Sequence, residues 1–294
     1  VDYLITSKRR LKLLIAEGLV TGWDDPRLGT LAGMRRRGYP AEAIRNFCRL
    51  TGVAKRDNQQ EFELLEFRVR EVLNKIALRY MAVLNPVKLV ITNYPEGQVE
   101  YLTTTNNPED ESVGSREMPF SRELYVERED YKKEPQNRKY FRLAPGKDVR
   151  LKSGYIVHCD GHEEDEEGNV TQINCTYYPD SKSGSDTSGV KAKGTLHWVS
   201  ADHAVDLEIR NYDKLFTDPT PMSHEGKDFL EFINPDSLTI TTAKGEPALA
   251  EIETGGRHFQ FLRKGYYVSD PDTQKDKPVF NLTVDLKSGF KPGK

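Results

Sequence analysis

The sequence predicts a mainly β protein with an N-terminal α-helical subdomain, followed by two antiparallel β-barrels. Through about residue 84, apolar residues recur at three- and four-residue steps, which is the spacing of amphipathic helices. From residue 87 onward, short runs rich in β-branched and aromatic residues alternate with clusters of Gly, Pro, Asn and Asp. Many short strands of this kind favour antiparallel barrels or a sandwich, and roughly 200 residues fit two barrels better than one.

Local signals place the first three helices. An apolar pattern begins at residues 11–15, directly after a basic cluster. Thr30 is expected to cap a short helix that Gly38 terminates, because a hydroxyl satisfies a free N–H group and glycine tolerates the conformation past a helix end. Pro40 then marks the start of another helix, which closes at Gly52.

A fourth, longer helix is expected after these. Asn58 followed by Glu61 is a capping pattern, in which the two side chains satisfy free N–H groups of the first turn. Apolar positions at helical spacing then run from Phe62 to Tyr80. We expect this helix to end before Asn85, because a proline follows and disfavours helix in the residue before it.

The β-rich segments after the helices predict the strands and loops of the rest of the chain. Val205, Leu207 and Ile209 alternate with polar residues, which is typical of a half-buried strand. The acidic run at 163–169 is expected to form a solvated hairpin tip, and the Ser/Gly-rich segment 181–188 another loop. The predicted strands cover residues 87–91, 99–102, 124–126, 149–157, 173–178, 193–199, 204–210, 238–240, 259–262 and 279–286.

Charge is distributed unevenly along the chain. The net charge of the 294 residues is -3, but residues 1–90 hold 17 Lys+Arg against 10 Asp+Glu, a net of +7, and the remaining 26 against 36, a net of -10. A basic first third points to a polyanion partner for part of the surface. No run approaches the roughly 20 apolar residues that span a bilayer, and the first residues are neither a signal nor a transit peptide. The chain has no initiator Met, so we expect it to be part of a longer protein.

The cysteines do not indicate a metal site. Cys48, Cys159 and Cys175 show neither CxxC spacing nor histidines at zinc-ligand intervals. Cys159 and Cys175 are spaced to face each other across a hairpin. We expect buried free thiols and therefore a reducing, cytoplasmic setting.

The opening segment carries the first chemical signal. Residues 5–11, which read ITSKRRL, resemble the mobile signature loop of class I aminoacyl-tRNA synthetases in its glutaminyl form, with Thr6 where that family often has methionine. The resemblance implies an ATP-binding loop in which Lys8 stabilises the charge that develops as pyrophosphate leaves. A basic helix start is the alternative for this segment alone. The implied ATP-binding residues are Thr6, Ser7, Lys8, Arg9 and Arg10.

The next segments extend this resemblance. Residues 22–28 and 30–39 are very similar to the helical subdomain of glutaminyl- and archaeal/eukaryotic-type glutamyl-tRNA synthetases. From the residues themselves, Asp24 and Asp25 are suited to capping or pairing with the arginine-rich turn, while Trp23 packs. The three arginines at 35–37 are also suitable phosphate contacts.

Later matches imply a tRNA-binding surface. Residues 52–58 resemble the family segment that meets the anticodon stem-loop, and residues 78–89 match a family segment whose arginine contacts anticodon bases. Residues 140–143 and 146–152 carry cations at family contact positions. Residues 258–266 resemble a glutaminyl-specific strand that contacts a base edge. His197, Trp198 and His203 fall in the barrel framework, so a packed Trp with hydrogen-bonded histidines is favoured over a catalytic or metal site. The implied tRNA-binding residues are Lys55, Arg56, Asn58, Arg79, Arg142, Arg150, Lys152, Gln260 and Arg263.

Together these matches imply the C-terminal half of a glutamine–tRNA ligase. Residues 1–84 would hold the signature loop and helical subdomain. Residues 85–294 would hold two anticodon-binding barrels, similar to ribosomal proteins that bind 5S rRNA, which exchange strands and divide near 190–205. Expected partners are a glutamine tRNA and a missing N-terminal catalytic half. ATP with Mg2+ serves the intact enzyme, and the isolated part is expected to be a monomer, inactive alone and without a metal site. The alternatives are an archaeal/eukaryotic-type glutamyl-tRNA synthetase or a free-standing RNA-binding β-barrel protein.

Overall fold

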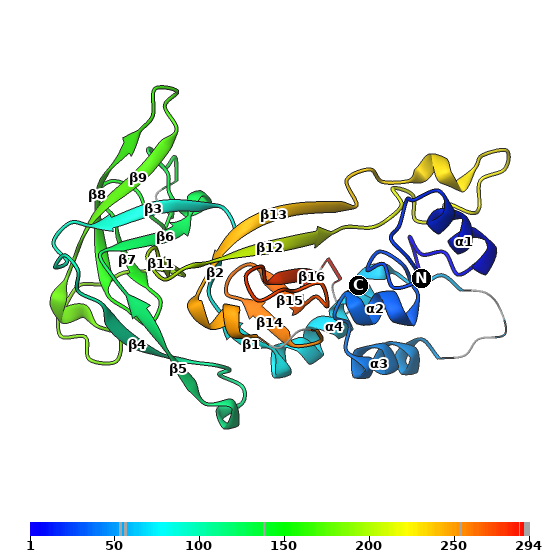
Figure 1. The fold of residues 1–294 in the computed structure, drawn as a ribbon, viewed down its shortest axis with the longest axis horizontal. Helices are drawn as coiled ribbons and strands as arrows, with labels where there is room; N and C mark the ends of the chain where they lie inside the picture. Colours follow the sequence, from blue (N-terminus) through cyan, green and yellow to red (C-terminus); the bar gives the residue numbers. More distant parts are fainter. Residues whose placement is uncertain (53–54, 56–57, 138, 253–254, 288, 291–294) are drawn as a thin grey trace. The chain divides into compact units, whose positions relative to one another are not determined.

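The structure is a computed structural model that describes residues 1–294 except 53–54, 56–57, 138, 253–254, 288 and 291–294 (Figure 1). The chain divides into two compact units. Unit 1 comprises Val1–Leu78, Glu208–Thr241 and Ile252–Lys294, and unit 2 comprises Arg79–Leu207 and Thr242–Glu251. Strands β12 (Val205–Tyr212) and β13 (Leu238–Gly245) have residues in both units.

The helices of unit 1 are α1 (Lys8–Ala16), α2 (Leu31–Arg36), α3 (Ala41–Thr51) and α4 (Phe62–Ile76). The predicted caps of α2 are confirmed. The N–H of Gly33 donates to the hydroxyl of Thr30 at 2.9 Å, and Gly38 follows the helix with φ +92°. The predicted bounds of α3 are also confirmed, with Pro40 before its first turn and Gly52 at its C-cap.

The prediction for α4 was wrong at both ends. Glu61 occupies the N-cap without a side-chain cap bond, and Asn58 is exposed outside the helix. The helix ends at Ile76, so Tyr80 lies in β1 (Leu78–Tyr80) instead. Residues 77–79 and 81–83 are buried, and in such a continuously buried stretch apolar periodicity does not separate a helix end from a strand.

The core of unit 1 joins the helices to strands from the end of the chain. Helices α3 and α4 pack with β14 (His258–Phe261), β15 (Gly265–Ser269) and β16 (Val279–Asp285). Strand β15 pairs antiparallel with β14 and β16, and β16 pairs parallel with β12. The buried cluster is Tyr39, Ala43, Phe47, Leu65, Val69, Val72, Leu73, Ala77, Tyr266 and Val284.

Unit 2 is built on a seven-stranded sheet in the order β10-β7-β8-β9-β3-β6-β11. Most pairs are antiparallel, while β3–β9 and β10–β7 are parallel. A second hairpin joins β4 (Glu100–Thr105) to β5 (Ser115–Phe120), and β2 (Ala82–Val83) pairs with the end of β13. The sheet strands are β3 (Pro86–Ile91), β6 (Glu123–Glu127), β7 (Asp148–Leu151), β8 (Ile156–Glu164), β9 (Val170–Tyr177), β10 (Thr195–Leu196) and β11 (Val199–Ser200).

The predicted fold class, mainly β after N-terminal helices, is confirmed. The strand predicted at 149–157 is two strands, β7 and β8, joined by a turn, and sequence reasoning missed β1, β2, β5 and β15. The acidic run lies at the tip of the β8–β9 hairpin as expected. The division into domains predicted from the sequence stays a prediction.

An aromatic cluster forms the centre of unit 2. The ring of Phe120 lies 5.1 Å from that of Trp198 and 5.2 Å from that of Tyr94. Trp198 is fully buried and donates to the carbonyl of Lys152 at 2.9 Å, and His197 lies 3.2 Å from a carboxylate oxygen of Glu127. The packed Trp and bonded histidine are therefore confirmed as framework.

The cysteine prediction is correct for two of the three residues. Cys159 and Cys175 face each other across β8 and β9, and both are buried and free. Cys48 is also free but exposed on α3, so the expected burial was wrong for it. Among the residues described, no helix is long and apolar enough to cross a membrane.

Candidate nucleic-acid interface

A cavity of about 300 Å3 in unit 2 joins two segments that are distant in the sequence. Gly194, just before β10, makes this approach possible. A Cβ at Gly194 would lie 1.7 Å from the carbonyl oxygen of Phe141, so the main chain of Phe141 rests directly on the glycine. The cavity is lined by Tyr140, Phe141, Arg142, Gly146, Lys147, Asp148, Lys191, Lys193 and Gly194.

The cavity combines an exposed aromatic ring with positive charge. Phe141 is 45% exposed, and the ammonium of Lys193 lies 5.2 Å from the centre of its ring. Arg142, Lys147 and Lys191 supply further positive charge. The single carboxylate, Asp148, already accepts hydrogen bonds from other side chains of unit 2. A stacking surface among cations suits an unpaired nucleotide, because the base can stack while the cations meet the phosphates.

Among the predicted tRNA-binding residues that the structure describes, Arg142 alone lines this cavity. Its guanidinium lies 3.2 Å from the carboxylate of Asp130, while 48% of the side chain remains exposed. The carboxylate is almost fully buried, so this ion pair orients the arginine without shielding it. Arg142 therefore remains accessible to a ligand.

The other predicted residues near this sheet have different environments. Arg150 donates to the carbonyl of Ser181 at 2.7 Å and pairs with Asp186, so its hydrogen-bonding capacity is largely used inside unit 2. Lys152 is exposed at the turn after β7. Arg79 is only 7% exposed on β1, so the structure does not present it as a surface contact.

The main chain of Arg79 is held by a buried ion pair. Arg116 donates to the carbonyl of Arg79 at 2.8 Å, and its guanidinium lies 3.8 Å above the ring of Tyr80. The same guanidinium pairs with Glu246 at 2.6 Å and donates to Asn106 at 2.8 Å. Burial raises the pKa of Glu246 to about 7, because desolvation outweighs the attraction of Arg116. The arginine thus links three segments of unit 2.

In unit 1, two predicted residues lie on the β14–β15 hairpin. Gln260 is half-buried on β14 opposite Tyr266. Arg263 is exposed in the loop between the strands and has φ +67°, a conformation that costs a non-glycine residue energy. Lys55 and Asn58 are exposed between α3 and α4, and Arg56 lies outside the described residues.

The predicted ATP-binding residues lie at the start of α1. Thr6 and Ser7 are exposed before the helix, and Ser7 occupies the N-cap without a side-chain cap bond. Lys8, Arg9 and Arg10 form the first turn, which corrects the expectation of a loop for these three. Leu11 and Leu14, which follow in the same helix, are buried, and their packing stabilises a helix that begins at Lys8. The turn contains no acidic residue.

The motif after α1 is mainly structural. Asp24 pairs with Arg36 at 3.0 Å, as predicted, whereas Asp25 pairs with Arg27 at 2.7 Å. Burial opposes ionisation of Asp25, but the hydrogen bonds from Arg27 and the main chain hold the pKa of this carboxyl below its ordinary value. Trp23 is 43% exposed, so its predicted packing was wrong.

The predicted use of three arginines as phosphate contacts is also corrected. Arg36 pairs with Asp270 and Asp272, and Arg37 is buried and donates to main-chain carbonyls. Arg35 alone of the three is exposed. Carboxylates and carbonyls that are distant in the sequence therefore engage two of the three cations.

Sequence reasoning missed several lining residues of the cavity. Phe141, Lys147, Lys191 and Lys193 were not selected as binding residues from the sequence. The sequence did contain a signal for these residues, namely an aromatic residue beside cations and two lysines just before a glycine.

Comparison with known proteins places the chain. It matches three family models of class I tRNA synthetases of the glutamate (E) and glutamine (Q) type: the catalytic domain over residues 1–75 and anticodon-binding domains over 77–178 and 195–270. It is 55% identical to a glutamine–tRNA ligase of Rhodopirellula baltica, over 98% of this chain and 48% of that protein. It is 51% identical to the glutamine–tRNA ligase of Clostridium perfringens, over 98% of this chain and 52% of that protein. It is 49% identical to that of Salmonella newport, over 98% of this chain and 51% of that protein. The chain spans about half the length of these curated relatives. It belongs to the class I tRNA synthetases of the glutamate and glutamine type, and within them to the glutaminyl-tRNA synthetases.

Proposed function

We propose that this chain binds the anticodon arm of a glutamine tRNA and takes part in the ATP-dependent attachment of glutamine to that tRNA. The cavity of unit 2 carries the proposal, because an exposed Phe141 among four cations suits an unpaired nucleotide. The names of the relatives support glutamine as the amino acid and tRNA as the partner.

The proposal also includes the other predicted tRNA-binding residues, whose environments in the structure differ. Lys152 and Arg263 have exposed side chains, which is compatible with contact to RNA. The buried Arg79 requires a local rearrangement before it can meet a base, and Arg150 would have to exchange its partners within unit 2. Lys55, Asn58, Gln260 and Arg56 stay predictions from resemblance.

The start of α1 is suited to ATP phosphates. Three successive cations, no acidic residue and the positive end of the helix dipole favour an anion there. Lys8 and Arg9 would hold the phosphates, with the exposed hydroxyl of Ser7 as a further donor. ATP supplies the free energy for joining glutamine to tRNA, and the Mg2+ that accompanies it is part of the proposal.

The test uses the anticodon stem-loop of glutamine tRNA and a labelled titration at one fixed salt concentration. Phe141→Leu should weaken binding by about 1–3 kcal/mol, the range for loss of one stacked base, and Phe141→Tyr should restore it. Lys275→Gln changes an exposed lysine of unit 1 and serves as the control. Equal affinities for Phe141→Leu and the native chain would contradict the proposal.

A further inference from the structure

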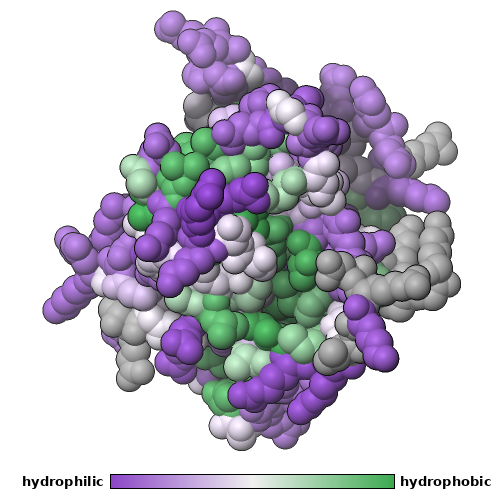
Figure 2. All heavy atoms as spheres, turned by 90° about the vertical axis from the view of Figure 1, so that its right-hand side faces the viewer, coloured by the Kyte–Doolittle hydropathy of each residue, from purple (hydrophilic) through white to green (hydrophobic). Residues whose placement is uncertain are grey.

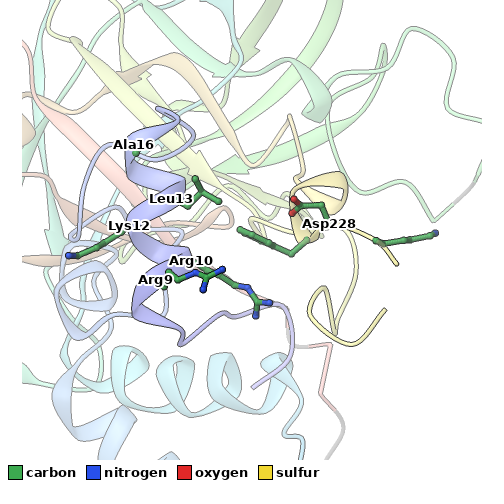
Figure 3. Close-up of a pocket in the computed structure, with 8 residues that line it drawn as sticks. Arg9, Arg10, Lys12, Leu13, Ala16 and Asp228 are labelled. Atoms are coloured by element: carbon green, nitrogen blue, oxygen red, sulfur yellow. The ribbon is translucent and has the colours of Figure 1, made fainter. Parts of the chain in front are cut away.

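The cavity beside α1 in unit 1 belongs to a site already proposed. It has a volume of about 650 Å3 and is lined by Arg9 and Arg10, which extend toward the segment that carries Asp228 (Figure 3). Both arginines are among the predicted ATP-binding residues. Figure 2 shows hydrophobic areas exposed between protruding hydrophilic side chains on the side of the molecule that it presents. The chemistry that the proposed function does not use lies in unit 2, in the buried thiols of Cys159 and Cys175.

The two cysteines lie directly opposite each other in the antiparallel pairing of β8 with β9. The N–H of Cys159 donates to the carbonyl of Lys147 at 2.9 Å, and its carbonyl accepts from the N–H of Gly146 at 2.8 Å. The carbonyl of Cys175 accepts from the N–H of Thr92 at 2.8 Å. Both main chains therefore bond away from each other. Such a non-hydrogen-bonded pair is the closer kind in an antiparallel sheet, with Cα atoms about 4.5 Å apart.

This pairing is suited to a disulfide. Disulfides join Cα atoms about 4.4–6.8 Å apart, so the two sulfurs can bond without a change of strand register. Hydrogen bonding with the Cys175 thiol lowers the pKa of Cys159, whereas the same interaction and burial raise the pKa of Cys175. Cys159 is therefore the better nucleophile, and Cys175 stays a protonated thiol until it is needed.

An irregularity in β8 gives a reagent access to the pair. The register of β8 against β9 shifts between Cys159 and Gly161, and Asp160 between them is exposed. Such a shift disrupts the strand pairing locally, so opening of a few residues at this point brings the Cys159 thiol to solvent without unfolding of unit 2.

The main chain of Cys159 is bonded to the wall of the unit 2 cavity. Gly146 and Lys147, its two hydrogen-bond partners, both line that cavity. Asp148, the next lining residue, lies 2.9 Å from Nδ1 of His158 on β8. Disulfides most often hold Cα atoms about 5.5–6 Å apart, so a disulfide here would widen the pair by about 1 Å. Because Gly146 and Lys147 are bonded to Cys159, this movement would displace the wall of the cavity.

We propose that Cys159 and Cys175 form a reversible disulfide that weakens binding of the anticodon arm at the unit 2 cavity. The effect on binding rests on the proposed function, whereas formation of the disulfide does not. The oxidant is a low-molecular-weight disulfide of the glutathione class. The Cys159 thiolate attacks one of its sulfurs and releases one small thiolate, which leaves a mixed disulfide on Cys159. Cys175 then loses its proton and attacks Sγ of Cys159, and the second small thiolate leaves. Two electrons pass to the small disulfide, and the two cysteine protons end on the two small thiols.

The experiment uses the chain with Cys48→Ala, which removes the exposed cysteine and leaves only the pair. The chain is equilibrated in glutathione buffers from reduced to oxidised, remaining thiols are alkylated, and the mass reports how many are left. Both thiols should become protected together and should return when the oxidised sample is reduced again. Cys48→Ala/Cys159→Ala/Cys175→Ala is the control for any effect of the buffer itself on RNA binding.

The reduced, oxidised and re-reduced samples are then titrated with the anticodon stem-loop of glutamine tRNA. The oxidised chain should bind at least about fivefold more weakly, the low end of typical coupling between two sites, and re-reduction should restore the affinity. The coupling is reciprocal. Saturating stem-loop should therefore shift the equilibrium of the pair with glutathione toward the dithiol by the same factor. The affinity of the cysteine-free control should not depend on the buffer.

Three results would overturn the proposal. The first is that both thiols stay open to alkylation in oxidised glutathione, or that only the mixed disulfide forms. The second is a complete disulfide with unchanged affinity for the stem-loop. The third is a loss of binding that re-reduction does not restore, which would show damage to the fold. The proposed function fails in a different way, because the reduced chain would then show no stem-loop binding that depends on Phe141.

Discussion

Replacing Arg116 by methionine should destabilise unit 2 by about 3–5 kcal/mol, the usual cost of leaving one charge of a buried pair without its partner. Glu246 is 1% exposed, and the guanidinium of Arg116 pairs with it at 2.6 Å. The change also removes hydrogen bonds to Asn106 and to the carbonyl of Arg79, both at 2.8 Å. Methionine keeps much of the volume, so the loss reports charge and hydrogen bonding more than a cavity.

The cost should depend on pH with a defined sign. Burial raises the pKa of Glu246 from 4.5 to about 7 in the folded state, so the folded state binds more protons between these values. The contribution of Glu246 to native stability should therefore fall as pH rises through this window and level off above it. Arg116 holds this pKa down, so its removal extends the fall to higher pH. The gap between Arg116→Met and the native chain should widen by about 1.4 kcal/mol from about pH 6 to about pH 8.

Urea unfolding followed by the fluorescence of the buried Trp198 measures this effect, in a Trp23→Phe background that leaves one tryptophan. Arg122→Met is the control, because its ion pair is with a well-exposed carboxylate and should cost less than about 1 kcal/mol. Arg116→Met/Glu246→Met should recover part of the loss. A cost below about 1 kcal/mol, a gap that does not change with pH, or no recovery in the double variant would refute the reasoning.

Three further predictions concern unit 1, each measured by thermal unfolding. Gly38→Ala should cost about 2–4 kcal/mol, since Gly38 has φ +92° and a new Cβ would lie 2.7 Å from that of Val268; a neutral result would contradict the predicted clash. Thr30→Ala should cost about 1 kcal/mol by removing the cap of α2, and Thr30→Ser should restore it. Arg36→Met should cost about 2 kcal/mol by removing a partner of the buried Asp270, and an unchanged melting temperature would show that the pair contributes nothing.

Signals between near neighbours in the sequence predicted structure well. The cap at Thr30 and the stop at Gly38 depend on hydrogen bonds and backbone angles within a few residues, so α2 could be predicted from its own sequence. The same kind of signal failed at Asn58, because the chain there does not enter the helix until Phe62. A capping pattern shows that a cap is chemically available, but it does not show that the helix begins there.

The candidate site depended on contacts that the sequence pattern does not contain. Phe141 and Lys193 meet because Gly194 admits the main chain of Phe141, and nothing local to either segment predicts that approach. Partners distant in the sequence also decide which cations are available. Asp270 forms an ion pair with Arg36, whereas Arg142 keeps nearly half of its side chain exposed despite its own ion pair. The motifs therefore predicted the positions of cations in the sequence better than they predicted which of these cations are accessible to a ligand.

The most direct test of the central claim is a binding titration of this chain against glutamine tRNA and a copy with altered anticodon bases, at one fixed, moderate salt concentration. The proposed function predicts tighter binding of the native anticodon, by about 1–3 kcal/mol for each altered base that is contacted. Equal binding of the two tRNAs would contradict anticodon recognition by this chain and would leave only contacts that are independent of base sequence.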